Sequence, residues 1–462
     1  MPRVNPIDTE YFKDERQAGD FTVIGTTVQR SDALGHVTGR TEFFEDRTFP
    51  DLAHVKVHRS AHHHARIDSV DCSETLKVPG VLRVITHRDV PSNWYVVLRL
   101  IGIEPNDEPV LAEDRVLYKG EPIVAVVADS EAAAIEGAAR VRVSYTELPA
   151  VFDVEEALAP DAPVIKQAGT NYFVYEGHHA RRLRFGDVER GFAQSDRIFE
   201  WRYSSAPIEH APTETTGCIV VPQSSGRLLI HSNTQAAFFT LDNTALILDR
   251  PFTDLQVKGG TVGGGFGGKV DVMVEPLACI AAALTNRPVK FVYTREEEMQ
   301  VSSPRAAERI YIKDGVTNDG RILARKVMLY VDAGAYSRHS PYGTTKACAH
   351  LPGPYTIPNV YADCHCVYTN RTPSSAMRGF GVTIADFALE SQMDRIARAL
   401  DLDPLQFRLR NAYRDGDLKA HRKVAEGTAL IEVIQRAAAL VGHELPDEYL
   451  ALTSTTPRGD EA

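Results

Sequence analysis

The feature that most constrains this chain is a glycine-rich loop between a predicted strand at residues 255–257 and a predicted helix at residues 275–284. The loop reads GGGFGGKVD over residues 263–271. Five glycines in six positions carry a high cost in backbone entropy, so they are kept where the backbone approaches another group closely or adopts a positive φ. The loop therefore predicts either a ligand held against bare backbone N–H groups or a tightly packed turn without a ligand.

Two nucleotide-binding patterns overlay on the loop, and both are incomplete. Gly263, Gly268 and Lys269 match the P-loop, but that motif continues with a hydroxyl residue that holds Mg²⁺, and Val270 has no oxygen. Gly263, Gly265 and Gly268 fit a dinucleotide turn, which requires an acid about 20 residues further on to hold the ribose. Glu296 follows the next predicted strand too late for that role. A different bulky cofactor, planar or charged, remains as the third alternative.

Composition excludes several classes of protein. The chain has 462 residues, enough for two or three domains, and a net charge of −11, which disfavours nucleic-acid binding. Its six cysteines are scattered and form no C-x-x-C pair, which disfavours both a disulfide framework and a protein-ligated zinc or iron–sulfur centre. Apolar runs stay shorter than the roughly 18–20 residues of a membrane helix, and the N-terminus has no apolar signal region. We therefore expect a cytoplasmic protein without membrane or nucleic-acid partners.

The order of strands and helices predicts a mixed α+β chain with a small α/β domain before a larger α+β domain. In the small domain, the alanine-rich helix at 130–140 lies between strands at 123–127 and 141–145, which predicts a βαβ unit. The predicted divisions are an N-terminal arm at 1–20, the α/β domain at 21–155, a connecting segment at 156–185, the larger domain at 186–450 and a disordered tail at 451–462.

The glycine loop resembles the signature of the molybdopterin-binding large subunit of the xanthine dehydrogenase/aldehyde oxidase family, the molybdenum hydroxylases. Further segments resemble the same family in the same order and together span most of residues 21–415. They are RSAHHHARI at 59–67, VRVSYTELPAVFDVEEAL at 141–158, GDVERGFA at 186–193, NTQ at 233–235, YTIPN at 355–359, AMRGFG at 376–381, and the segments 390–395, 403–404 and 408–411.

The resemblance implies a molybdenum–molybdopterin cofactor, either as the plain pterin or in its dinucleotide form. In this family the dithiolene sulfurs of the pterin hold the metal, so no direct protein ligand is expected. Gln235 would hydrogen-bond an oxygen ligand of the metal, because an amide donates without adding charge. Gly265, Phe266 and Gly267 would lay backbone against the cofactor, and Arg378 would contribute to the same pocket.

The resemblance also implies a substrate pocket that contains Val270, Lys346 and Phe380. Purine-oxidising members carry a glutamate at the position of Val270, so valine disfavours a purine. Lys346 is either a group that attracts a carboxylate or ring nitrogen or an ordinary surface lysine. Phe380 would face the substrate ring.

Nothing after about Asp417 resembles the second molybdopterin domain of the family, which supplies the general-base glutamate. The resemblance therefore implies a split large subunit of the nicotinate dehydrogenase type, with no catalytic residue assigned on this chain. Its expected partners are a subunit with the second molybdopterin half, a 2Fe–2S subunit and an FAD subunit. The expected reaction hydroxylates an electron-poor carbon of an N-heteroaromatic substrate with oxygen from water. An aldehyde- or purine-oxidising subunit and a non-catalytic cofactor-binding scaffold are the alternatives.

Overall fold

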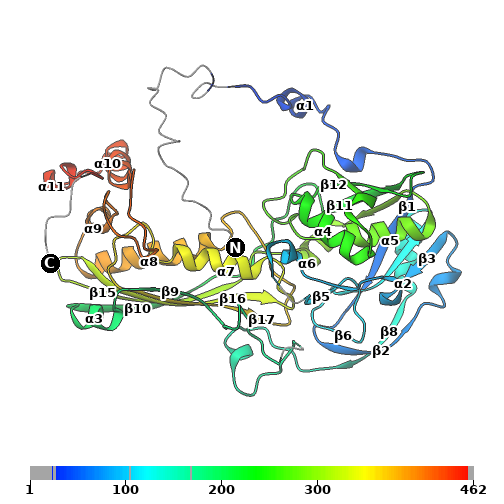
Figure 1. Cartoon of the computed structure of the whole chain (residues 1–462), viewed down its shortest axis with the longest axis horizontal. Helices are drawn as coiled ribbons and strands as arrows, with labels where there is room; N and C mark the ends of the chain where they lie inside the picture. Colours follow the sequence, from blue (N-terminus) through cyan, green and yellow to red (C-terminus); the bar gives the residue numbers. More distant parts are fainter. Residues whose placement is uncertain (1–22, 24–27, 104–105, 167–168, 456–462) are drawn as a thin grey trace.

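The computed structural model describes residue 23 and residues 28–103, 106–166 and 169–455, and it shows a mixed α+β architecture (Figure 1). The predicted fold class is confirmed. The predicted arm at residues 1–20 lies outside the described residues. Residues 451–455 differ from the predicted disorder, because Ser454 is buried and its backbone N–H donates to Glu432 at 2.6 Å.

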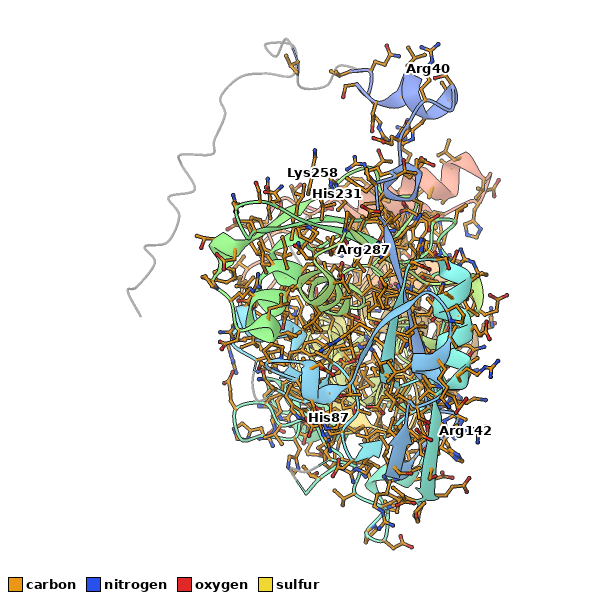
Figure 2. The ribbon with its side chains drawn as sticks, turned by 90° about the vertical axis from the view of Figure 1, so that its right-hand side faces the viewer. Arg40, His87, Arg142, His231, Lys258 and Arg287 are labelled. Carbon is orange, nitrogen blue, oxygen red and sulfur yellow. The ribbon has the colours of Figure 1, made fainter. Side chains whose placement is uncertain are left out.

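The largest sheet has seven strands in the order β13-β12-β11-β14-β1-β7-β3. These strands are β1 (Ala53–Arg59), β3 (Val81–Ile85), β7 (Pro122–Ala128), β11 (Gly217–Pro222), β12 (Leu228–Ser232), β13 (Leu255–Lys258) and β14 (Val289–Val292). At one edge, β12 and β13 run parallel with His231 opposite Lys258, and both side chains are labelled in Figure 2. In the centre, β1 pairs with β14 through Ala53 and Val289. One sheet thus joins the parts before and after residue 155, and the division into domains near that residue stays a prediction.

The second large sheet has five strands in the order β10-β15-β16-β17-β9. Its strands are β9 (Arg181–Phe185), β10 (Arg197–Ser204), β15 (Glu308–Val316), β16 (Ile322–Gly334) and β17 (Val360–Tyr368). Helices α7 (Ser340–His350) and α8 (Val382–Ala399) cover one face, and the short α3 (Val188–Ala193) lies on the other (Figure 1). Buried side chains of α7 and α8 pack with strand residues such as Ile312 and Leu329 in one apolar core.

Two smaller sheets and the remaining helices complete the fold. The strands are β2 (Ala65–Asp71), β6 (Arg115–Val116) and β8 (Arg142–Glu147) in one sheet, and β4 (Trp94–Tyr95) and β5 (Glu108–Pro109) in the other. The helices are α1 (Ala33–Val37), α2 (Glu131–Arg140), α4 (Ala237–Leu248), α5 (Glu275–Thr285), α6 (Arg295–Val301), α9 (Pro404–Asn411), α10 (Leu430–Leu440) and α11 (Asp447–Leu450).

The predicted βαβ unit is wrong, although its three elements exist. Strand β7 lies inside the seven-stranded sheet, whereas β8 leaves it and pairs antiparallel with β2. The burial of the two strands gives the reason. β7 is an apolar run buried along nearly its whole length, but Arg142, Ser144 and Thr146 of β8 are exposed. A parallel strand in a sheet covered on both faces cannot present such a polar face.

Candidate functional site

The glycine loop leaves β13 at the end of the seven-stranded sheet and enters α5. Three of its residues have positive φ, namely Gly264 at 103°, Phe266 at 52° and Gly267 at 104°. Gly268 closes a turn by donating its N–H to the carbonyl oxygen of Gly265 at 2.7 Å. The Phe266 side chain is 48% exposed, so the loop presents this ring to the outside of the chain.

An ion pair behind the loop holds it in shape. The Nζ atom of Lys269 lies 3.0 Å from a carboxylate oxygen of Glu214, and the same oxygen accepts the N–H of Gly263 at 2.7 Å. Lys269 is only 2% exposed. Burial lowers the pKa of Lys269, and the Glu214 carboxylate works in the opposite direction. Because the lysine points into the protein, it cannot serve a phosphate as a P-loop lysine does, and sequence reasoning missed Glu214 as its partner.

Gln235 lies against the loop just before α4 begins. Its backbone N–H donates to the carbonyl oxygen of Lys269 at 2.8 Å, and its side-chain oxygen accepts the N–H of Gly267 at 3.0 Å. A Cβ atom at residue 265 would lie 2.4 Å from that side-chain oxygen, so a larger residue there would displace the Gln235 amide. Among the described residues, nothing accepts a hydrogen bond from the Gln235 amide nitrogen, and the residue is exposed. With the oxygen occupied by the loop, the nitrogen is free to donate to a ligand.

The second predicted loop, at residues 376–381, contacts the first. Arg378 donates its backbone N–H to the carbonyl oxygen of Phe266 at 2.7 Å. A Cβ atom at residue 267 would lie 2.7 Å from the carbonyl oxygen of Ala376, so only glycine fits between the loops. His210, whose side chain is fully buried, bonds the same Ala376 oxygen through Nε2 at 2.8 Å. His210 was not predicted, because a lone histidine in a loop carries no spacing signal.

The three predicted substrate-pocket residues lie on different parts of the site. The Phe380 ring centre is 5.4 Å from that of Tyr342 on α7, and the Nζ atom of Lys346 lies 5.1 Å from the Tyr342 ring centre. Phe380 and Lys346 therefore both contact Tyr342, on one face of α7. Val270 is half-buried at the end of the glycine loop, one residue before Asp271. Arg378 has an exposed side chain, so its contact with the glycine loop is made by the backbone alone.

Asp271 joins the three segments, and sequence reasoning missed it. One of its carboxylate oxygens lies 2.6 Å from Nδ1 of His339, directly before α7, and accepts the Ser375 hydroxyl at 2.9 Å. Burial works to raise the pKa of Asp271, but the hydrogen bond from His339 and the charge of Arg338 more than offset it, so the pKa lies below its usual range. Asp271 is therefore a buried carboxylate that fixes His339.

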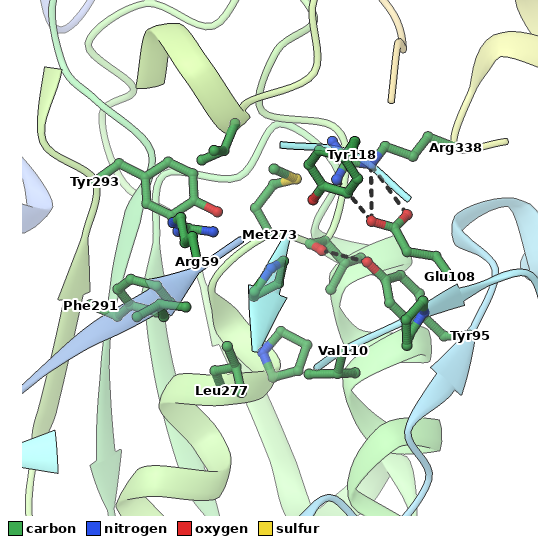
Figure 3. Close-up of a pocket in the computed structure, with 16 residues that line it drawn as sticks. Arg59, Tyr95, Glu108, Val110, Tyr118, Met273, Leu277, Phe291, Tyr293 and Arg338 are labelled. Carbon is green, nitrogen blue, oxygen red and sulfur yellow. Dashed lines mark hydrogen bonds and ion pairs between the residues drawn. The ribbon is translucent and has the colours of Figure 1, made fainter. Parts of the chain in front are cut away.

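A hollow behind this cluster lies between strands of the N-terminal part and the α5 region (Figure 3). Arg338 crosses one side and pairs with Glu108, its guanidinium 2.8 Å from a carboxylate oxygen. The hollow is lined mainly by apolar and aromatic side chains, among them Tyr95, Phe291 and Tyr293. The Arg338–Glu108 pair anchors the residue next to His339.

The residues present fit a cofactor that brings its own metal ligands. In the part of the chain that the structure describes, no three His, Cys, Asp or Glu side chains gather to hold a metal ion. The site offers bare glycine backbone, an exposed aromatic residue with positive φ, and a free amide donor at Gln235. Such groups can orient a large ligand and hydrogen-bond it, but they cannot coordinate a metal by themselves.

Comparisons with known protein families agree with this site. Residues 172–412 match the family described as Molybdopterin cofactor-binding domain, and residues 38–149 match the Aldehyde oxidase and xanthine dehydrogenase, a/b hammerhead domain. The chain belongs to the xanthine dehydrogenase/aldehyde oxidase family of molybdenum-dependent oxidoreductases, and its cofactor is molybdenum–molybdopterin. The resemblance inferred from the glycine loop is confirmed.

The match with this chain covers a different share of each relative's length. The chain is 35% identical over 419 residues to the nicotinate dehydrogenase large molybdopterin subunit of Eubacterium barkeri, covering 90% of this chain and 96% of that one. It is 36% identical over 389 residues to a probable xanthine dehydrogenase subunit of Bacillus subtilis, covering 84% of this chain and 51% of that protein. The aldehyde oxidoreductase structure from Desulfovibrio gigas superposes with a TM-score of 0.85 at 30% identity, covering 90% of this chain and 46% of that one. The chain thus spans about half the length of the last two.

Proposed function

We propose that this chain is the molybdopterin-binding subunit of a multi-subunit hydroxylase that acts on an N-heteroaromatic carboxylate such as nicotinate. The observation that carries the proposal is the junction of the two loops, where Arg378 donates to Phe266 and Gln235 keeps a free amide nitrogen. The similarity to a nicotinate dehydrogenase subunit over 96% of its length supports this substrate class.

Each residue of the junction has a binding role in this proposal. Gln235 donates a hydrogen bond to an oxygen ligand of the metal, while Gly265, Phe266 and Gly267 form the backbone surface on which the cofactor rests. Arg378 holds the second loop against the first. When bound, the molybdenum cofactor supplies the redox centre that accepts an electron pair from the substrate carbon and transfers oxygen derived from water.

The substrate side of the site accounts for the preference among ring compounds. Phe380 and Tyr342 offer aromatic faces, and Lys346 adds a positive charge at the end of the same helix face. Val270 offers no hydrogen bond to a purine ring, which disfavours the purine alternative. A simple aldehyde is the second candidate, because the solved aldehyde oxidoreductase shares this fold.

The chain needs partners in this proposal. The general base is a glutamate on a subunit with the second molybdopterin half, and electrons leave through 2Fe–2S and FAD subunits. No helix among the described residues has the length and apolar character to cross a membrane.

The test is to purify the chain together with the proteins that bind it, measure molybdenum and pterin, and assay turnover with an artificial electron acceptor. We expect about one molybdenum per chain and faster turnover of nicotinate than of xanthine or benzaldehyde. Molybdenum without nicotinate turnover contradicts the substrate class, and a complex without molybdenum supports the scaffold alternative.

A further inference from the structure

His339 sits between the segments that carry the site. Its ring centre lies 5.6 Å from that of Phe239 in the first turn of α4, which follows Gln235, and 6.2 Å from that of Phe380. Its Nδ1 atom binds Asp271. No described residue bonds its Nε2 atom, which is not sealed from solvent, and the side chain is 8% exposed. Nε2 is therefore the ring nitrogen of His339 that is left for a ligand, next to two aromatic residues that flank the site.

The position of His339 is fixed from two directions. The side chain of Asp271 is fully buried and carries a negative charge, so the hydrogen bond assigns the proton to Nδ1 of the histidine. On the other side, Arg338 has a φ of 39° and its guanidinium forms a two-pronged contact with Glu108. A histidine held in this way loses little conformational freedom when its Nε2 atom binds a ligand.

Helix α7 places an aromatic and a basic side chain on the same side as this histidine. Tyr342 and Lys346 follow His339 by three and seven residues, so the three side chains share one side of the helix. Gly343 faces Phe380, and a Cβ atom there would meet the Phe380 ring at 3.4 Å, an ordinary van der Waals distance. The Phe380 ring thus lies near both His339 and Tyr342, and Tyr342 is the residue whose ring Lys346 approaches.

We propose that His339, held by Asp271, is the specificity-determining residue that binds the carboxylate of the substrate. With Nδ1–H directed to Asp271, the Nε2 edge of the ring is left for the substrate, and an imidazolium N–H at this edge donates a charge-assisted hydrogen bond to a carboxylate oxygen. Lys346 is exposed at the helix surface and adds only a screened charge. This inference rests on the proposed function, since it assigns the contact that selects the substrate class.

The experiment compares nicotinate with its neutral amide, nicotinamide, in the purified complex carrying His339→Gln. We expect kcat/KM for nicotinate to fall on the order of 10- to 100-fold, mainly through KM, while the value for nicotinamide changes less than about threefold. Asp271→Asn, which keeps the shape but not the charge, should lower the preference in the same direction. His350→Gln, at the far end of α7, is the matched histidine control and should leave both substrates unchanged.

Binding of benzoate by calorimetry gives a readout that does not depend on turnover. We expect His339→Gln to weaken benzoate binding and to leave benzamide binding as it is, with unchanged molybdenum content showing an intact site. Equal losses for acid and amide, or loss of the preference in Lys346→Met but not in His339→Gln, overturn the assignment. Failure of the wild-type complex to turn over nicotinate defeats the proposed function, whereas turnover with an unchanged preference in His339→Gln defeats this inference alone.

Discussion

Glu214 and Lys269 form a buried ion pair, 3.0 Å from oxygen to nitrogen, that fastens both ends of the glycine loop. The Glu214 carboxylate also accepts the N–H of Gly263 at the start of the loop, and Lys269 belongs to the end of the loop. The buried Glu214–Lys269 ion pair therefore holds the two ends of the loop together.

Lys269→Met should strongly destabilise the protein, because it leaves Glu214 buried without its partner. We expect a loss of about 3–5 kcal/mol in the free energy of unfolding, measured by denaturant titration. Lys258→Met, at an exposed position of β13, should change it by less than about 0.5 kcal/mol. Equal effects of the two substitutions would show that the ion pair does not hold the loop.

Gly267→Ala should separate the two loops. The added Cβ would meet the carbonyl oxygen of Ala376 at 2.7 Å, at a residue with a φ of 104°. We expect a loss of bound molybdenum, measured by elemental analysis of the purified complex. Gly260→Ala, where nothing lies within 4 Å of the added atom, is the matched control and should retain the metal. Full metal content in Gly267→Ala would contradict the contact between the loops.

Gln235→Glu should separate the two functions of the amide. The carboxylate still offers an oxygen to the N–H of Gly267, but it has no donor and adds a negative charge. We therefore expect molybdenum to be retained while kcat falls about 10- to 100-fold. Gln256→Glu, exposed on β13, should be neutral. A fully active Gln235→Glu complex refutes the donor role.

Glu308→Gln should change how stability depends on pH. Burial raises the pKa of Glu308 to about 8, and Arg305 works against this rise. Between about pH 4.5 and 8 the folded protein keeps a proton that the unfolded chain releases, so stability falls as pH rises through this range.

Glutamine cannot release that proton. At pH 8 the Glu308→Gln variant should therefore exceed the wild type by on the order of 3 kcal/mol in unfolding free energy, with a smaller difference at pH 5. Glu200→Gln on exposed β10 is the control and should follow the wild type at both values. A constant difference between pH 5 and pH 8 would show that Glu308 does not hold the proton.

Elements with a strong local pattern could be predicted from the sequence. The helix at 275–284 and the strand at 81–85 appear as α5 and β3 within one residue of the predicted bounds. Helix α7 was missed because SPYGTTKACAH combines a glycine and two threonines of low helix propensity. Helix α4 was missed because no side chain caps its start.

The candidate site could be predicted only where a family motif marks it. Gln235, Phe266 and Arg378 meet at one place, although their roles toward the cofactor stay predictions. The contact between Asp271 and His339 could not be predicted from the sequence. The two residues are 68 positions apart, and neither belongs to a motif with a known spacing. Contacts of this kind depend on tertiary packing, which a local pattern does not encode.

The placement of β1 beside β14 has a consequence for how the chain reaches its fold. The two strands lie far apart in the sequence. For example, Nζ of Lys56 donates a hydrogen bond to the carbonyl oxygen of Val292, 236 residues further on. At a synthesis rate of about 5–20 residues per second, β1 waits tens of seconds on the ribosome before its second neighbour exists. Throughout that time one edge of β1 can pair with a foreign strand. Slow translation or overexpression should therefore favour aggregation through this edge, and a chaperone that covers it should raise the yield of native protein.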